Sequence, residues 1–211
     1  KIAVDTLLAH SKYLAFAASS DESRAVLTGI LVIAGKSTTT LVTTDGYRLS
    51  LKKIDQPTGE NEEEEKFILP ARVFAEVAKI VSEKKKNDEE KDEAYLVLKE
   101  TNNQVAFVLK NVEIDTRLIE GEFPTYGKII PQTHSTRAVF DKEEFAKAVK
   151  LSSIFARDSA NIVKMKFTKD ALILSANASQ VGENTCEVGA NVEGEENEIA
   201  FNSRFLLDFL A

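Results

Sequence analysis

Two kinds of hydrophobic spacing alternate along the 211-residue chain. In residues 5–18 and 141–156 apolar side chains recur every three or four positions, which predicts two amphipathic helices. Asp5 and Asp141 stand at the starts of these stretches, where an N-cap is needed. Short runs rich in Val, Ile, Leu and Thr, separated by turn residues, predict strands. These runs are 29–33, 39–43, 48–54, 67–70, 94–99, 104–109, 112–119, 162–167, 171–176, 183–188 and 199–202.

The predicted elements occur twice, at an offset of about 132–137 residues. Each copy consists of a helix, three strands, and a further strand that leads into a second helix, at 71–84 and at 203–211. Pro70 stands at the start of the first of these helices, where its missing N–H costs nothing. Asn202 is a suitable cap at the matching place in the second copy. The spacing therefore indicates a repeated α+β domain.

The two copies are unequal in length. Three further strands close the first copy, whereas the second copy stops within its apolar second helix. We therefore expect one domain at 1–132, a short polar link at 133–137, and a second domain at 138–211 that is incomplete at its C-terminus. We expect the second domain to be incomplete because its second helix is apolar and no later strand follows to cover it.

The net charge of −7 argues at first against a nucleic-acid partner. The acids, however, gather in segments 60–65, 88–93 and 193–198, which lack apolar periodicity and are predicted to be turns or solvated loops. Without these fourteen acids and Lys91, 20 acids and 26 bases remain, a balance of +6. This distribution allows a basic face elsewhere on the molecule, although acidic runs also serve simply to keep loops solvated.

The sequence contains no recognisable catalytic or cofactor motif. It has no glycine-rich phosphate loop, and His10 and His134 are isolated from any other metal-ligating residues. We expect no cofactor, no metal site and no catalytic residues. No apolar run approaches the roughly 18 residues that span a bilayer, and the lone Cys186 suits a reducing cytoplasm.

Three islands of sequence carry a more specific signal. They are Leu27-Thr28-Gly29, then Thr44-Asp45-Gly46-Tyr47-Arg48-Leu49, and then the stretch 119–131, which contains Gly-Glu-Phe-Pro-Thr-Tyr and Ile-Ile-Pro. In this order, and on a matching repeat, they resemble the bacterial DNA polymerase III beta subunit, the processivity sliding clamp. The resemblance runs through essentially all 211 residues and covers the middle domain and about half of the third domain.

The resemblance implies a fold and a function. Clamps of this family are two-subunit rings of repeated domains, in which helices line the hole and antiparallel sheets form the outer layer. Such a ring is not an enzyme: it encircles double-stranded DNA without reading its sequence. Partners dock outside through short linear motifs; they include the DNA polymerase III alpha subunit, the clamp loader and other proteins with clamp-binding motifs. We expect a bacterial cytoplasmic protein, dimeric in full length, with the present chain monomeric.

The resemblance also places a partner-peptide groove between the middle and third domains. Apolar members of the groove would hold a Leu or Phe anchor, and Arg or Lys at its rim would hold a peptide carboxylate or carbonyl. The positions carried over from the family are Leu27, Thr44, Gly46, Tyr47, Arg48, Leu49, Pro124, Lys128, Ile129, Asn202 and Phe205.

This chain departs from the family pattern in the groove. Family members complete the groove with residues at their extreme C-terminus, which are missing here. The apolar position between the first helix and the next strand of the third domain is taken by Ala160, smaller than the aromatic often found there. We therefore expect a shallow groove and micromolar or weaker binding of a partner peptide.

A DNA face is predicted from basic residues at helical spacing. A clamp that slides should contact phosphates and leave the bases unread. Lys12 and Arg24 are weaker candidates, and the run 84–86 also fits a solvated helix end, because surface basic residues are usually present for solubility. The residues expected to face DNA are Arg24, Arg72, Lys79, Lys147, Lys150 and Arg157.

Two alternatives from other classes stay open at this point. One is a small enzyme whose site centres on Asp45, Tyr47 and Arg48, for which the sequence offers no second catalytic constellation. The other is a purely structural repeat protein without DNA or peptide partners, against which the excess of positive charge outside the acidic segments argues mildly.

Overall fold

The computed structural model describes residues 2–3, 8–55, 64–87, 95–99, 103–109, 112–178 and 182–211. Asp5, most of the acidic segments 60–65 and 88–93, and the side chains of 84–86 lie outside this description. The chain divides into two compact units, Lys1–Pro124 and Thr125–Ala211. Each unit has its own antiparallel sheets, helices and hydrophobic core, so the predicted α+β class is confirmed.

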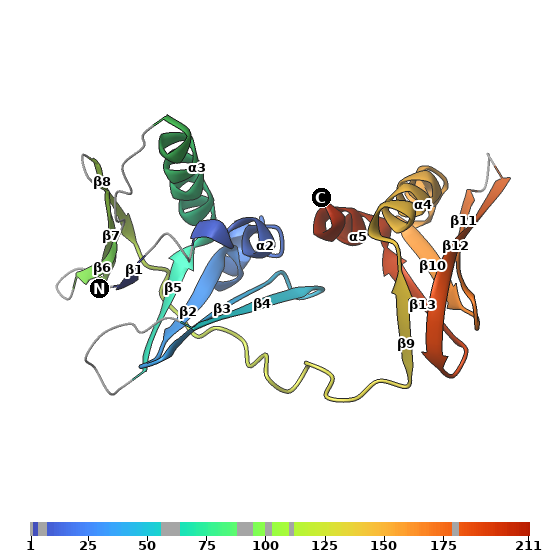
Figure 1. Ribbon diagram of the computed structural model, residues 1–211. Coiled ribbons are helices and arrows are strands. Elements are labelled where there is room, and N and C mark those ends of the chain that lie inside the picture. Colours follow the sequence, from blue (N-terminus) through green and yellow to red (C-terminus); the bar gives the residue numbers. More distant parts are fainter. Residues whose placement is uncertain are drawn as a thin grey trace. The chain divides into compact units, whose positions relative to one another are not determined.

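In its described residues the first unit combines two four-stranded antiparallel sheets with the helices α2 and α3 and one 3₁₀ helix (Figure 1). The sheets have the strand orders β4-β3-β2-β5 and β1-β6-β7-β8. The elements are β1 (Ile2–Ala3), α2 (Lys12–Ala15), the 3₁₀ helix η1 (Glu22–Thr28), β2 (Gly29–Ala34), β3 (Thr38–Thr44), β4 (Leu49–Asp55), β5 (Glu65–Pro70), α3 (Ala71–Asn87), β6 (Tyr95–Lys99), β7 (Gln104–Leu109) and β8 (Val112–Arg117).

Both sheets of the first unit contribute to one core. Ile30 and Leu41 come from the first sheet, Phe107 from the second, and Phe74 and Val77 from the buried face of α3. The 17-residue helix α3 therefore contributes an apolar stripe to the core, and its start directly after Pro70 is as predicted.

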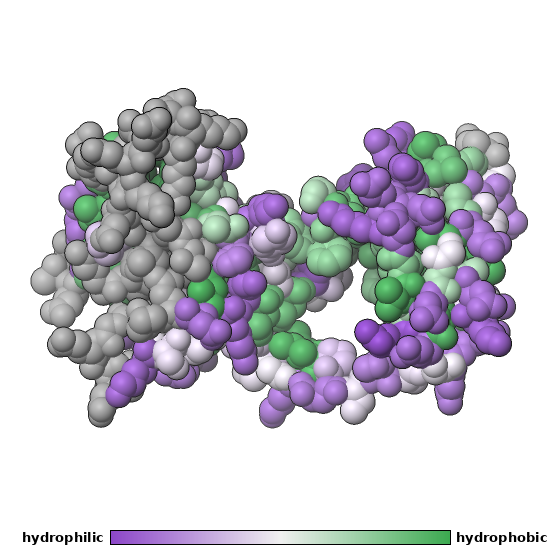
Figure 2. All heavy atoms as spheres, viewed as in Figure 1, coloured by the Kyte–Doolittle hydropathy of each residue, from purple (hydrophilic) through white to green (hydrophobic). Residues whose placement is uncertain are grey.

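The second unit has one five-stranded antiparallel sheet in the order β13-β10-β11-β12-β9. Helices α4 and α5 lie side by side, and α4 packs on the central strands of the sheet (Figure 1). In Figure 2, hydrophobic residues reach the visible surface of this unit only in scattered groups among hydrophilic ones. The elements are β9 (Thr136–Phe140), α4 (Lys142–Ala156), the 3₁₀ helix η2 (Arg157–Ser159), β10 (Ile162–Phe167), β11 (Ala171–Ala178), β12 (Gly182–Gly194), β13 (Asn197–Asn202) and α5 (Ser203–Leu210).

The predicted repeat is confirmed by strand order. The order β4-β3-β2-β5 in the first unit corresponds, strand for strand, to β12-β11-β10-β13 in the second. Both predicted caps that fall on described residues are also present. The Asp141 side chain accepts a hydrogen bond from the Glu144 amide at 2.9 Å, and the Asn202 side chain accepts one from the Arg204 amide at 2.9 Å.

Three local predictions were wrong. Within residues 8–18, the described part of the helix expected at 5–18, helical residues occur only at 8–9 and in α2, and the chain turns away where the Ser19 amide bonds to the Leu27 carbonyl. Thr136 and Arg137, assigned to the polar link, instead begin β9 and pair with Gly194 and Glu193 of β12. The placement of the functional domain boundaries at 132 and 138 remains a prediction.

The third error concerns the acidic segment 193–198, which was expected to be a loop. Most of it lies in the ends of β12 and β13, with only the turn between them irregular. Acidic side chains are tolerated in these strands because they are exposed. Glu198 lies on the edge strand β13, where charge also discourages pairing with other chains, and Glu193 of β12 forms an ion pair with Arg137 of β9 at 3.4 Å. No helix among the described residues is long and apolar enough to cross a membrane.

Candidate binding site on the turn after strand β3

The turn between β3 and β4 is organised by the side chain of Asp45. One carboxylate oxygen of Asp45 accepts hydrogen bonds from the backbone amides of Tyr47 at 2.9 Å and Arg48 at 3.0 Å. The other oxygen accepts from Arg48 Nε at 3.0 Å, and only 14% of the Asp45 side chain is exposed. Asx turns of this kind fix the backbone locally. The same contacts explain why the strand predicted to begin at Arg48 begins at Leu49 instead.

Thr44 completes the turn from the other side. Its hydroxyl donates to the Arg48 carbonyl at 2.7 Å and accepts from the Gly46 amide at 3.1 Å. Gly46 has a φ of +95°, a conformation that L side chains rarely adopt. A Cβ at this position would lie 3.3 Å from a guanidinium nitrogen of Arg24. Gly46 therefore provides both the turn geometry and room for that arginine.

Arg24 brings η1 against this turn. Its guanidinium donates to the Asp45 carbonyl at 3.2 Å and to the Asp21 carboxylate at 3.3 Å. Asp21 in turn caps η1 by accepting from the Ser23 amide at 3.0 Å and the Ser23 hydroxyl at 2.7 Å. Arg24, predicted to face DNA, is thus part of the same cluster as the predicted groove residues. The only sequence signal for this was the Asp-x-Ser cap, which begins three positions before Arg24.

The turn is also fixed to the first helical segment. The Arg48 guanidinium carbon lies 5.4 Å from the centre of the Phe16 ring, within the range of a cation–π contact. The buried hydroxyl of Thr43 donates to the Leu14 carbonyl at 2.8 Å. Arg48 is only 19% exposed in its side chain, whereas Tyr47 is 82% exposed at the tip of the turn. The turn therefore presents an exposed aromatic ring on a backbone fixed from several sides.

The island at 119–121 packs beside the other end of η1. The Ile119 amide donates to the Ile68 carbonyl at 2.9 Å, which holds the segment against β5. Gly121 has a φ of +125°, and a Cβ there would lie 2.7 Å from a methyl carbon of Val26. Leu27, the next residue after Val26, is 7% exposed. The first and third sequence islands are therefore neighbours in the fold, and glycine is required at their contact.

The predicted groove residues of the first unit differ in exposure. Leu27 and Thr44 are buried, Arg48 and Leu49 are half-buried, and Gly46, Tyr47 and Pro124 are exposed. In the second unit Lys128 and Ile129 are exposed, with Ile129 at 65%, while Asn202 and Phe205 are half-buried at the start of α5. Ala160 adopts a left-handed conformation with a φ of +55° and is exposed.

The basic residues predicted to face DNA lie on exposed helix surfaces. Arg72 and Lys79 are exposed on α3, where Lys79 forms an ion pair with Glu76 at 2.8 Å. On the second unit Lys147, Lys150 and Arg157 are all exposed. Phe145 and Val149, predicted to lie on the opposite side of α4, are buried.

We expect the carboxylate of Asp21 to titrate at unusually low pH. Hydrogen bonds from the Ser23 hydroxyl and amide, and then from Arg24, lower the pKa of Asp21. With a lowered folded-state pKa, its stabilising effect is complete above the pKa of the unfolded chain and is lost as pH falls through the folded-state pKa. Carbon-detected NMR titration of the Asp21 carboxyl, repeated in Ser23→Ala, checks this. A midpoint that does not rise in the variant would contradict the cap.

Comparisons with known proteins agree with one another. The family model for the central domain of the DNA polymerase III beta subunit matches residues 1–125, and the model for its C-terminal domain matches residues 127–211. The chain is 34% identical to the beta sliding clamp of Chlamydia pneumoniae and 32% identical to that of Staphylococcus aureus. Each alignment covers 92% of this chain and 50% of the relative, so the chain spans about half the length of these relatives.

Solved structures show the same similarity. The DNA polymerase sliding clamp of Bacillus subtilis superposes with a TM-score of 0.85 at 29% identity, covering 99% of this chain and 53% of that one. The DNA polymerase III beta subunit of Thermotoga maritima superposes with a TM-score of 0.86, also at 29% identity, covering 99% of this chain and 54% of that one.

Proposed function

Because the chain belongs to the DNA polymerase III beta subunit family, the beta sliding clamps, we propose that it functions in a processivity clamp. In this role it contributes two domains to a ring around double-stranded DNA and tethers the replicative polymerase to its template. The main observation in support of this proposal is the turn at residues 44–49, the most specific of the three sequence islands. Asp45 fixes the backbone of this turn, and Arg24 connects the turn to η1.

We infer that this turn forms part of a docking groove for partner peptides. Half-buried Leu49 and buried Leu27 supply apolar surface, and exposed Pro124 extends it. Arg24 and Arg48 supply guanidinium groups whose positions are set by Asp21 and Asp45. A preorganised arginine loses less conformational freedom on binding a carbonyl or carboxylate than a free one. Lys128, Ile129, Asn202 and Phe205 of the second unit are proposed to complete the groove.

The proposed partners follow from this role. They are double-stranded DNA, the DNA polymerase III alpha subunit, the clamp loader and other proteins with clamp-binding motifs, all in the bacterial cytoplasm. For DNA, exposed Arg72, Lys79, Lys147, Lys150 and Arg157 offer phosphate contacts without base readout. Binding through such contacts depends steeply on salt concentration. We propose that a full-length dimer closes the ring and that the present chain is monomeric.

The proposed role is non-catalytic. The enzyme alternative requires Asp45, Tyr47 or Arg48 to act on a substrate. The Asp45 carboxylate accepts two backbone amides and the Arg48 guanidinium, so its oxygens already serve the turn and are poorly placed to accept a substrate proton. The structural-repeat alternative gives no reason for an exposed Tyr47 at the tip of so firmly fixed a turn.

We expect a labelled pentapeptide of the Gln-Leu-x-Leu-Phe type to bind this chain with micromolar or weaker affinity. Leu49→Ala and Pro124→Ala should each weaken binding about tenfold, because each removes apolar contact surface from the peptide anchor. Fluorescence polarisation measures both effects directly.

The matched controls are Val112→Ala, an exposed valine on β8, and Pro131→Ala, an exposed proline later in the same loop. Neither should change the affinity. Nanomolar binding would refute the expected shallow groove, and equal losses in the controls and the test variants would refute its location.

A further inference from the structure

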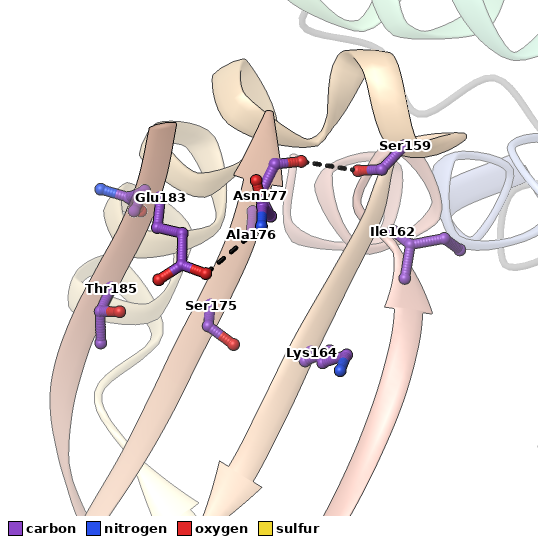
Figure 3. Close-up of a pocket in the computed structure, with 9 residues that line it drawn as sticks. Ser159, Ile162, Lys164, Ser175, Ala176, Asn177, Glu183 and Thr185 are labelled. Carbon is purple, nitrogen blue, oxygen red and sulfur yellow. Dashed lines mark hydrogen bonds between the residues drawn. The ribbon is translucent and has the colours of Figure 1, made fainter. Parts of the chain in front are cut away.

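A cavity of about 320 Å³ lies on the second unit, and none of its lining residues is assigned to the groove or to the DNA face. It opens on the outer face of the sheet, where β10, β11 and β12 run next to η2 (Figure 3). Its side chains alternate along the strands with the buried core residues Val163, Met165 and Leu174. Lys164, Ser175 and Thr185 therefore point to the side of the sheet opposite to α4. Ala176 and Asn184 border the cavity from the other side, where the Asn184 side chain accepts a hydrogen bond from the Ser152 hydroxyl of α4 at 3.1 Å.

Strand register arranges the lining residues in two rows. Lys164 pairs with Ser175, and Ser175 pairs with Thr185, so an ammonium group and two hydroxyl groups cross three strands in line. In the next row Asn177 pairs with Glu183. Ser159 of η2 lies at the edge and donates a hydrogen bond to the Asn177 carbonyl at 3.2 Å. Antiparallel pairing thus fixes the relative positions of all these groups.

The cavity holds one positive and one negative charge that do not neutralise each other. Within the described part of the chain, Lys164 has no carboxylate partner, and Glu183 accepts only the amide of Asn177, at 3.3 Å. Figure 3 shows the Glu183 carboxylate turned toward Asn177, with Ser175 and Thr185 in the adjacent row. The hydroxyls of Ser175 and Thr185 likewise make no hydrogen bond to another described residue. Four polar groups are therefore available to a ligand.

We propose that this cavity binds a small zwitterion, such as a free amino acid or a dipeptide. Its carboxylate would accept hydrogen bonds from Lys164 and the two hydroxyls, and its ammonium group would donate to Glu183. The cavity volume is at the lower end of the range for small-ligand sites. Lys164 and Glu183 stand two strands and one row apart, a backbone separation of about 12 Å, so a dipeptide, whose charges are farther apart than those of a free amino acid, matches the spacing better.

The charge arrangement discriminates against simpler ligands. A singly charged anion satisfies Lys164 but meets the carboxylate of Glu183, and a singly charged cation satisfies Glu183 but meets Lys164. Only a ligand that carries both charges forms a favourable ion pair with Lys164 and with Glu183. Since the site is open to solvent, each ion pair contributes modestly, and the affinity should be millimolar.

The test is an amide NMR titration with three matched probes, namely glycylglycine, its N-acetylated form and its C-terminal amide. Glycylglycine should shift the amides of 164, 175 and 185 saturably, and each singly charged probe should bind about threefold more weakly. Lys164→Met and Glu183→Gln should each weaken glycylglycine binding by a similar factor.

The same strands supply matched controls. Lys166 and Glu187 are exposed on the same face of β10 and β12, one row outside the cavity. Lys166→Met and Glu187→Gln should therefore leave glycylglycine binding unchanged. The proposal is overturned by any of three results: no saturable shift, equal affinity for all three probes, or equal losses in the control and cavity variants. None of these results bears on the clamp assignment.

Discussion

Asp45→Ala is expected to lower the free energy of unfolding by about 2–3 kcal/mol and to weaken partner-peptide binding at least tenfold. The substitution leaves the amides of Tyr47 and Arg48 without their acceptor and releases the Arg48 guanidinium from a carboxylate at 3.0 Å. The turn then loses its fixed geometry, and Arg24 loses its defined approach to the Asp45 carbonyl. Urea unfolding and fluorescence polarisation measure the two effects.

Two further variants distinguish the effect of losing the hydrogen bonds of the turn from the effect of losing a negative charge. Asp45→Asn keeps an oxygen for the backbone amides but removes the charge that faces Arg48, so its losses should be intermediate. Asp55→Ala removes an exposed carboxylate from the opposite end of β4 and should change neither quantity measurably. If Asp45→Ala bound the peptide as well as the original chain, the turn could not be the preorganised wall that we propose.

Much of the fold was predictable from the hydrophobic pattern, because in most helices and strands the apolar residues keep the spacing of that element along its whole length. The strand β10 has the bounds that the sequence predicted, and α4 begins directly after the predicted cap Asp141. The failures lie where tertiary contacts override local spacing. In the described residues 8–18, the helix expected at 5–18 ends at Ala15, before the Ser19 amide bonds to the Leu27 carbonyl. The strand β9 forms because β12 offers it a partner.

The sequence predicted which residues belong to the candidate site, but it did not predict the hydrogen bonds that hold them in place. Family resemblance supplied Thr44, Gly46 and Arg48, yet the sequence did not show that Asp45 fixes them. That Arg24 faces DNA stays a prediction, and nothing in the sequence indicated that its guanidinium donates to the Asp45 carbonyl. Its place depends on η1, a 3₁₀ helix that has no hydrophobic period of its own.

The two units have separate hydrophobic cores, so a core substitution in the first unit should destabilise that unit alone. The largest expected change in stability comes from such a substitution. Phe74, 1% exposed, is central to the core of the first unit, and all described members of that core lie before residue 125. Phe74→Ala should lower the free energy of unfolding of the first unit by about 3–5 kcal/mol, from lost burial and from the cavity left behind. Urea unfolding followed by amide hydrogen exchange measures the loss and locates it.

Hydrogen exchange should accelerate in β2, β3 and α3 but remain unchanged in β10 and β11, because the core of the second unit contains no residue from the first. The matched control is Phe209→Ala, the same chemical change at a side chain that is 69% exposed on α5, with an expected effect under about 0.5 kcal/mol. Equal acceleration in both units would show that they unfold as one cooperative body.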